Sequence, residues 1–295
     1  MNELAEQGIA GGESITEAAA APTRATAGAR RRDVIRTPLP ADALRATLAR
    51  KALYWWSISV AAILLLTVGP PVLLVAWAAR RREWVYPPAL WGARTWLRLS
   101  GARVVVRGRE RLDPEATYIF IANHRSYLDT ATLFYYTGRR IGLLAKKELL
   151  QVPVLGVGMG FVNIMAIDRS NRQRAIETVR AATERIRRGV SFGVFAEGTR
   201  ARPGELLPFK KGAFYMAIEA GVPVAPVAIK NTDVLMGKGT GAARPGTIEV
   251  VFLPPVPTEG LSTERDEDVA RLIAETRALI AAELGADASA LATDA

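Results

Sequence analysis

The stretch Tyr118-Ile-Phe-Ile-Ala-Asn-His-Arg-Ser-Tyr-Leu-Asp129 decides the fold class, because an apolar run passes through a polar loop into a helix-compatible segment. The run 118–121 has the length and composition of a short buried strand. Asn123 and Ser126 are residue types that cap helix N-termini, so we expect a helix to follow Ser126. The stretch therefore predicts a strand–loop–helix unit.

Strands and helices alternate on both sides of this unit. Further strands are expected at 104–106, 190–196, 222–229 and 248–252, with helices at 171–188, at 212–220 and over the acidic segment before Gly285. Alternation of this kind predicts an α/β domain at residues 101–285, with a mixed sheet flanked by helices.

The composition removes several kinds of chemistry. The 295 residues contain no cysteine, which excludes disulfides and thiolate nucleophiles. With a single histidine, carboxylates are almost the whole supply of metal ligands, so we expect neither a metal nor a cofactor. The run 189–193 matches a serine nucleophile elbow, but that elbow needs a strand before the serine and a helix after it, and here the expected order is reversed.

The charge and the apolar runs point to a membrane. The net charge is +10, and the basic residues cluster around an apolar stretch instead of interleaving with aromatic residues along a separate groove. That distribution favours a membrane partner over nucleic acid. We expect a disordered tail at 1–40, a membrane-anchoring helical segment at 41–100 and a flexible C-terminus at 286–295.

The charge-free run from Ala52 to Ala79 is long enough to cross a bilayer, which takes ~20 apolar residues. Gly69-Pro70-Pro71 is expected to break it into two short pieces. Because basic residues flank both ends, a re-entrant monotopic anchor is favoured over a single crossing. A cleaved signal peptide is disfavoured, because the apolar run is longer than the ~7–15 residues of a signal-peptide apolar region and because a long tail precedes the run.

The single histidine, His124, lies five residues before Asp129. In a continuous helix these two side chains would lie ~140° apart, because each residue turns ~100°. A contact therefore needs His124 in the loop and Asp129 in the first turns of the helix. A carboxylate on one ring nitrogen would leave the other free as a general base. The alternative is a histidine that caps the helix and has no chemical role.

Two further clusters follow expected strands. Phe195-Ala-Glu-Gly-Thr-Arg200 combines a glycine, a hydroxyl and a guanidinium, which suits a phosphate; the alternative is a plain strand-ending turn. Arg169, in Ile167-Asp-Arg169, and Lys146 could meet on the same anion, although surface charge explains such pairs equally well. Ligands of open α/β sheets bind beyond the carboxyl ends of strands, where these loops would lie.

Taken together, these blocks resemble the 1-acylglycerol-3-phosphate acyltransferase family of glycerolipid acyltransferases. That family carries His-x4-Asp, an Arg-bearing block, Phe-Pro-Glu-Gly-Thr-Arg and Val-Pro-hydrophobic-x-Pro, in this order. The chain shows 123–129, 167–169, 195–200 and 222–226 in the same order, and the resemblance covers roughly residues 100–255. Ala196 replaces the family's proline, which should loosen the loop but removes no functional group.

The resemblance implies an enzyme that moves an acyl group from acyl-coenzyme A or acyl carrier protein to the 2-hydroxyl of lysophosphatidic acid. His124 would be the base and Asp129 its partner, with direct transfer and no acyl-enzyme. It also implies a place at the inner membrane, with the catalytic domain facing the cytoplasm. The substrate-binding residues expected on this basis are Arg125, Ser126, Lys146, Arg169, Glu197, Gly198, Thr199 and Arg200.

Two alternatives stay open. The same motifs serve other acceptors, such as a lyso-ornithine lipid or a glycolipid. Outside enzymes, the protein could be a basic membrane-surface binding protein without catalytic activity.

Overall fold

A seven-stranded sheet forms the centre of the protein in a computed structural model that describes residues 33–285. The strand order is β2-β9-β8-β3-β6-β4-β5, and every neighbouring pair is parallel except β8 and β9. The strands are β2 (Ala102–Arg107), β3 (Ile119–Ala122), β4 (Ile141–Lys146), β5 (Ile164–Ile167), β6 (Ser191–Phe195), β8 (Val224–Lys230) and β9 (Gly246–Phe252). The predicted α/β fold with a mixed sheet is confirmed.

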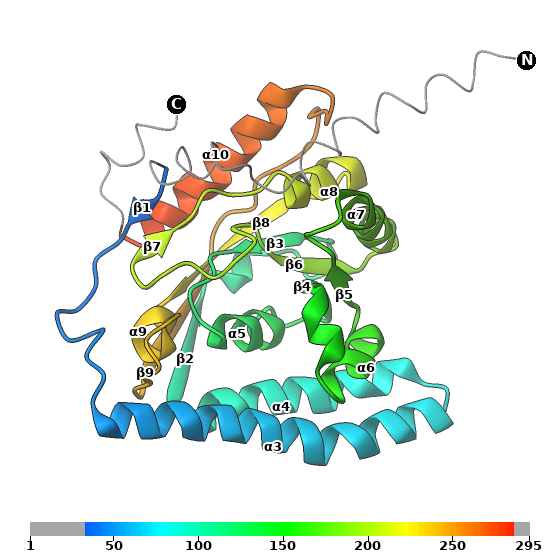
Figure 1. Cartoon of the computed structure of the whole chain (residues 1–295). Helices are drawn as coiled ribbons and strands as arrows, with labels where there is room; N and C mark the ends of the chain where they lie inside the picture. The colour runs from blue at the N-terminus through cyan, green and yellow to red at the C-terminus, as the bar shows by residue number, and fades with distance from the viewer. Residues whose placement is uncertain (1–32, 286–295) are drawn as a thin grey trace, which may run out of the picture.

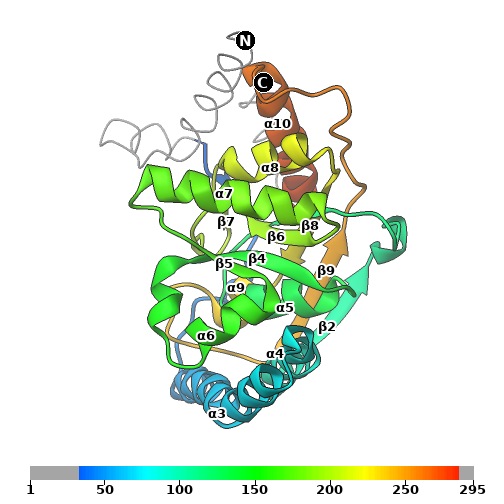
Figure 2. The same cartoon turned by 90° about the vertical axis from the view of Figure 1, so that its right-hand side faces the viewer.

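Helices cover both faces of this sheet (Figures 1 and 2). One face packs against α7 (Arg172–Arg187), α8 (Gly212–Ala220) and α10 (Asp266–Glu283), and the other against α4 (Tyr86–Leu99), α5 (Leu128–Tyr136) and α9 (Thr232–Met236). Side chains of a strand alternate between faces. In β3, Ile119 and Ile121 therefore join the first core, whereas Phe120 and Ala122 join the second.

Two strands, β4 and β5, were not predicted from the sequence. The β4 residues, Ile-Gly-Leu-Leu-Ala-Lys, include one β-branched and no aromatic side chain, and β5, Ile-Met-Ala-Ile, is only four residues long. Pairing at the sheet edge decides their conformation instead, with β4 between β6 and β5. Between these two strands the chain forms η3 (Lys147–Gln151), α6 (Leu155–Met159) and η4 (Gly160–Val162).

The expected disordered tail at 1–40 is wrong for its last eight residues; residues 1–32 and the expected flexible end at 286–295 lie outside the described residues. β1 (Ile35–Arg36) pairs antiparallel with β7 (Glu205–Leu206). Ile35 is buried in the core beside α10, and the amide of Thr37 donates to the carbonyl of Gly204 at 2.8 Å. One buried isoleucine and this pairing are enough to order a segment that its composition marks as disordered.

The expected break at Gly69-Pro70-Pro71 is also wrong, because α3 is continuous from Leu48 to Ala78 with both prolines inside it. Proline clashes with the Cβ of the residue before it, and Gly69 has no Cβ. Gly69 also packs closely against Val154 of the segment before α6. A short η1 (Arg82–Val85) then turns the chain into α4, which lies between α3 and the sheet (Figure 1).

Candidate active site

Loops that follow three parallel strands of the sheet, β3, β6 and β5, meet at the end of the sheet where these strands terminate. Ala122 at the end of β3 is in register with Phe195 at the end of β6, so the loops 123–127 and 196–200 leave the sheet side by side. β5 ends at Ile167 on the same edge and leads to Arg169. This juxtaposition gathers the sequence-predicted clusters, as expected for ligand sites of open parallel sheets.

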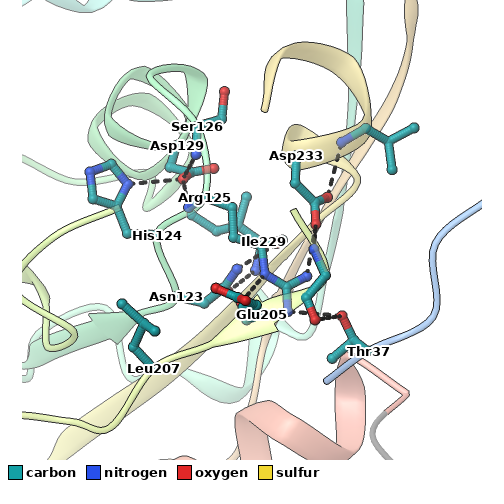
Figure 3. A network of polar contacts seen from close by, with 12 residues as sticks. Thr37, Asn123, His124, Arg125, Ser126, Asp129, Glu205, Leu207, Ile229 and Asp233 are labelled. Carbon is teal, nitrogen blue, oxygen red and sulfur yellow. Dashed lines mark hydrogen bonds and ion pairs between the residues drawn. The ribbon is translucent and has the colours of Figure 1, made fainter. Parts of the chain in front are cut away.

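His124 and Asp129 are in contact in the predicted arrangement (Figure 3). His124 lies in the loop, α5 begins at Leu128, and Nδ1 of His124 lies 2.9 Å from Oδ2 of Asp129. The Asp129 side chain is fully buried, while that of His124 keeps 16% of its surface exposed. A carboxylate accepts a hydrogen bond and does not donate one, so it places the proton of a neutral imidazole on Nδ1 and leaves Nε2 free to accept another.

The backbone fixes the Asp129 carboxylate in place. Its Oδ2 accepts hydrogen bonds from the amides of Arg125 at 2.6 Å and Ser126 at 2.7 Å, in addition to the imidazole. Both amides lie just before the first turn of α5, where backbone N–H groups have no partner within the helix. The dyad is therefore built into the helix start and depends little on side-chain flexibility.

Phe195 and Glu197, at the end of β6, contact His124 through its ring and its backbone amide respectively. The ring of Phe195 stacks on the imidazole with centroids 4.1 Å apart and an interplanar angle of 18°. Glu197 accepts hydrogen bonds from the amides of His124 at 2.6 Å and Leu207 at 2.9 Å. Burial raises the pKa of Glu197 to about 8, against the effect of these two amides and of Arg125, which lower it.

Arg125 and Ser126, expected to bind substrate, instead carry buried side chains that bind the protein itself. The guanidinium of Arg125 donates to the carbonyl of Glu205 at 2.7 Å, to Asp233 at 3.1 Å and to the hydroxyl of Thr37 at 2.9 Å (Figure 3). The Ser126 hydroxyl donates to the carbonyl of Met236 at 2.7 Å. Sequence spacing could not show this, because Thr37, Glu205 and Asp233 come from distant segments.

Glu197, also expected to bind substrate, is 3% exposed and has both carboxylate oxygens occupied by backbone amides. A signal for its role does exist in the sequence, since a carboxylate inside an apolar strand end needs internal donors. Asn123, directly before His124, also fixes this loop to the sheet. Its side-chain amide donates to the carbonyl of Ile229 in β8 and accepts from the amide of the same residue.

Of the remaining predicted residues, Arg169, Gly198, Thr199 and Arg200 form an open rim beside the dyad. Arg169 donates to the carbonyl of Gly198, and Thr199 is exposed. The guanidinium of Arg200 lies over the ring of Tyr127, 3.6 Å from its centroid. Gly198 has φ +70°, a backbone conformation that favours glycine, and the end of the Lys210 side chain lies beside it. Tyr127 and Lys210 were not predicted as site residues.

Lys146 stands apart from this rim. Its ammonium group pairs with Glu148 at 3.1 Å and its side chain is 59% exposed. The adjacent Lys147 pairs with Asp168 at 2.8 Å, and together with Ser170 it lowers the pKa of that carboxyl. The two lysines thus belong to local ion pairs, and Arg169 and Arg200 are the cations that border the dyad.

A carboxylate-held imidazole at the carboxyl edge of an α/β sheet defines a class of enzyme that works by general base catalysis. Comparison with known proteins narrows this class. The family model described as "Acyltransferase" matches residues 103–230, which include the dyad and the rim.

Relatives named 1-acyl-sn-glycerol-3-phosphate acyltransferase are identical to the chain at about a third of the aligned positions. The protein from Limnanthes douglasii is 32% identical over 68% of this chain and 72% of its own length. The human protein of that name, form alpha, is 35% identical over 56% of this chain and 59% of its own length. The chain belongs to the 1-acyl-sn-glycerol-3-phosphate acyltransferase family.

A solved structure extends the likeness to the fold. The crystal structure of the 1-acyl-sn-glycerophosphate (LPA) acyltransferase PlsC from Thermotoga maritima matches with a TM-score of 0.67 and 26% identity. The match covers 79% of this chain and 94% of that one, so it takes in much more than the motif-bearing loops.

The surface of α3 and α4 associates the protein with a membrane. Among residues 33–285, α3 is the one helix long and apolar enough to cross a bilayer, and only 6% of its most apolar stretch is buried. Large apolar side chains are exposed along both helices and η1: Leu48, Trp55, Trp56, Ile63, Leu66, Leu74, Val75, Trp77, Trp84, Trp91 and Leu99. An exposed apolar surface of this extent needs a partner, and a bilayer suits its tryptophans.

Proposed function

We propose that the protein transfers a fatty acyl group from an acyl thioester to the 2-hydroxyl of 1-acylglycerol 3-phosphate, which gives phosphatidic acid. The observation that carries this proposal is the 2.9 Å contact between Nδ1 of His124 and Asp129. It leaves Nε2 as the base for a hydroxyl. The names and identities of the relatives support the choice of acceptor.

The reaction needs two proton transfers and the exchange of a C–S bond for a C–O bond. Nε2 of His124 takes the proton of the 2-hydroxyl while its oxygen attacks the thioester carbonyl, and the Asp129 carboxylate stabilises the imidazolium that forms. The new C–O bond replaces the C–S bond, and the leaving thiolate takes the proton from the imidazolium. The residues contribute a base and its support, so no acyl-enzyme intermediate is required.

The rim would hold the phosphate of the acceptor. Arg200 and Arg169 border the dyad, and a guanidinium matches a phosphate with two parallel hydrogen bonds. Thr199 adds an exposed hydroxyl, and the backbone at Gly198 is free of a side chain. As donor we propose acyl-coenzyme A or acyl carrier protein, because a thioester is the one feature that the base mechanism needs.

We also propose that the anchor is monotopic, on the cytoplasmic side of the inner membrane. α3 contacts the folded domain near both ends: Ser57 bonds Ser100 at 2.7 Å, while Gly69 and Leu73 pack against the α6 segment. A helix attached to the folded domain along its length in this way can lie in the plane of the membrane. It would then insert into one leaflet and would not cross the bilayer. Basic residues at both ends, Arg50 and Arg80 among them, favour the cytoplasmic face.

The test is an acyl-transfer assay with the full chain purified in detergent, labelled oleoyl-coenzyme A and a panel of acceptors. We expect turnover with lysophosphatidic acid, weak turnover with lyso-ornithine lipid, and loss of about 10³-fold in kcat for His124→Ala. Arg103→Ala, on the exposed face of β2, is the control and should keep full activity. Preference for another acceptor would refute the substrate, and an active His124→Ala would refute the mechanism.

A further inference from the structure

A cavity of about 640 Å³ lies where α3 ends and turns into η1. Its lining combines two guanidinium groups, those of Arg80 and Arg82, with the aromatic rings of Trp77 and Phe161. The Arg82 guanidinium lies over the Phe161 ring, 5.8 Å from its centroid. Within residues 33–285 neither arginine has a carboxylate partner, whereas Arg81 between them pairs with Glu83 at 3.6 Å. The cavity therefore presents uncompensated positive charge.

The backbone at Arg80 is a second, independent observation. Arg80 has φ +55°, a left-handed conformation, and the amide of Arg81 donates to the carbonyl of Ala76 at 2.9 Å to close the helix. Glycine is the usual residue at this position of a helix end, because a Cβ is strained there. The sequence places a long cationic side chain where the fold favours glycine, and strain of this kind marks functional positions.

The cavity is separate from the dyad. Phe161 lies in η4, directly before the amino end of β5, whereas His124 follows the carboxyl end of β3. The strands β3, β6, β4 and β5 run parallel to one another. The cavity, at the amino ends of these strands, and the dyad, at their carboxyl ends, therefore lie at opposite ends of the sheet. The cavity therefore cannot hold an acceptor that reacts at His124.

From this geometry we propose that the cavity binds the phosphate headgroup of an anionic membrane phospholipid that is not a substrate. The exposed side chains of Leu74, Val75 and Trp77 adjoin it on α3, so a headgroup can enter while its chains stay in the bilayer. A soluble anion would gain nothing from this apolar border. Arg82 over Phe161 holds one charge in place, and Arg80 supplies the second. The proposal rests on the membrane association in the proposed function but not on the reaction.

The test measures binding of the full chain to phosphatidylcholine vesicles with and without 30% phosphatidylglycerol. Wild type should prefer the anionic vesicles. Arg80→Gly should lower that preference about fivefold, which is the ~1 kcal/mol that one basic residue contributes at an anionic surface. The same variant should keep or raise Tm because it relieves the strained backbone, so a loss of binding cannot come from unfolding. Arg81→Gln, with the same charge change outside the cavity, should lower the preference less than twofold.

Each other outcome has a definite meaning. Equal losses for Arg80→Gly and Arg81→Gln would overturn the site and leave only diffuse surface charge. A wild type that binds both vesicles equally would also overturn it, while membrane association would stand. A wild type that binds neither would refute the membrane part of the proposed function as well. If free glycerol 3-phosphate raised Tm through Arg80 as much as anionic vesicles do, the ligand would be a soluble anion and the lipid assignment would be wrong.

Discussion

The loop after β3 and the loops after β5 and β6 meet at the same end of the sheet. Apart from the buried carboxyl groups of Asp168 and Glu197, their polar side chains differ in burial. In the β3 loop the polar side chains are buried and bonded, with Asp129 at 0% and Arg125 at 3% exposure. On the other side, Arg169 and Thr199 are exposed, and Arg200 rests on a tyrosine ring. The comparison separates a rigid region that orients the base from an open region that meets the substrate. Mutations in the first should act on kcat and mutations in the second on KM.

Asp129→Asn tests the rigid region with the largest expected effect. An asparagine oxygen can accept the same three hydrogen bonds from His124, Arg125 and Ser126. Its NH2 group would take the place of Oδ1, which has no partner among residues 33–285, so we expect a loss of stability of ~1–3 kcal/mol, which a Tm measurement records. What is lost is the negative charge that stabilises the imidazolium. We expect kcat to fall about 10³-fold with KM for lysophosphatidic acid nearly unchanged.

Steady-state kinetics measure kcat and KM of Asp129→Asn, and Asp113→Asn is the matched control. Asp113 is an exposed carboxylate that accepts only the nearby amide of Glu115 at 2.9 Å, so its variant should behave as wild type. If Asp129→Asn raised KM and spared kcat, the carboxylate would belong to substrate binding and the division between the two regions would fail.

Arg125→Lys tests whether the rigid region extends to the N-terminal strand. Lysine keeps the charge but cannot reach Thr37, Glu205 and Asp233 together. The loop that carries His124 and the amide bound to Asp129 should loosen, and kcat should fall about 30-fold, because small misplacements of a base are costly. Thr37→Val removes one of the acceptors of the Arg125 guanidinium, and we expect it to lower kcat about threefold.

The control is Arg36→Gln. Arg36 lies on β1, directly before Thr37, but its side chain is exposed. The readout is kcat against KM below the unfolding transition, with Tm recorded for each variant. A rise in KM with kcat intact would return Arg125 to the substrate-binding role that its place in the motif implied.

Arg125 also shows what the sequence could and could not predict. Local features were readable: the spacing of His124 and Asp129 required a loop before a helix, and alternating apolar runs gave most of the strands. The roles of Arg125 and Ser126 were not readable, because the groups to which their side chains donate come from residues 80 or more positions away. The helix through Pro70 was missed for a similar reason, since packing against Val154 holds it.

Arg200→Lys tests the open region and should have a smaller effect than Asp129→Asn or Arg125→Lys. The guanidinium lies over the Tyr127 ring, 3.6 Å from its centroid. Lysine keeps the charge but offers neither the stacking nor the paired hydrogen bonds to a phosphate. We expect KM for lysophosphatidic acid to rise about tenfold, equivalent to ~1.4 kcal/mol, with kcat within twofold of wild type.

Initial rates across a range of acceptor concentrations measure this directly, and Arg202→Lys, an exposed arginine two residues away, is the matched control. The expected split differs in kind from that of Arg125→Lys, although both variants replace arginine by lysine. If the two gave the same pattern of kcat and KM, burial would not separate orientation from binding at this sheet edge. A tenfold rise in KM for Arg200→Lys alone would place the phosphate at the rim and leave the β3 loop to the proton.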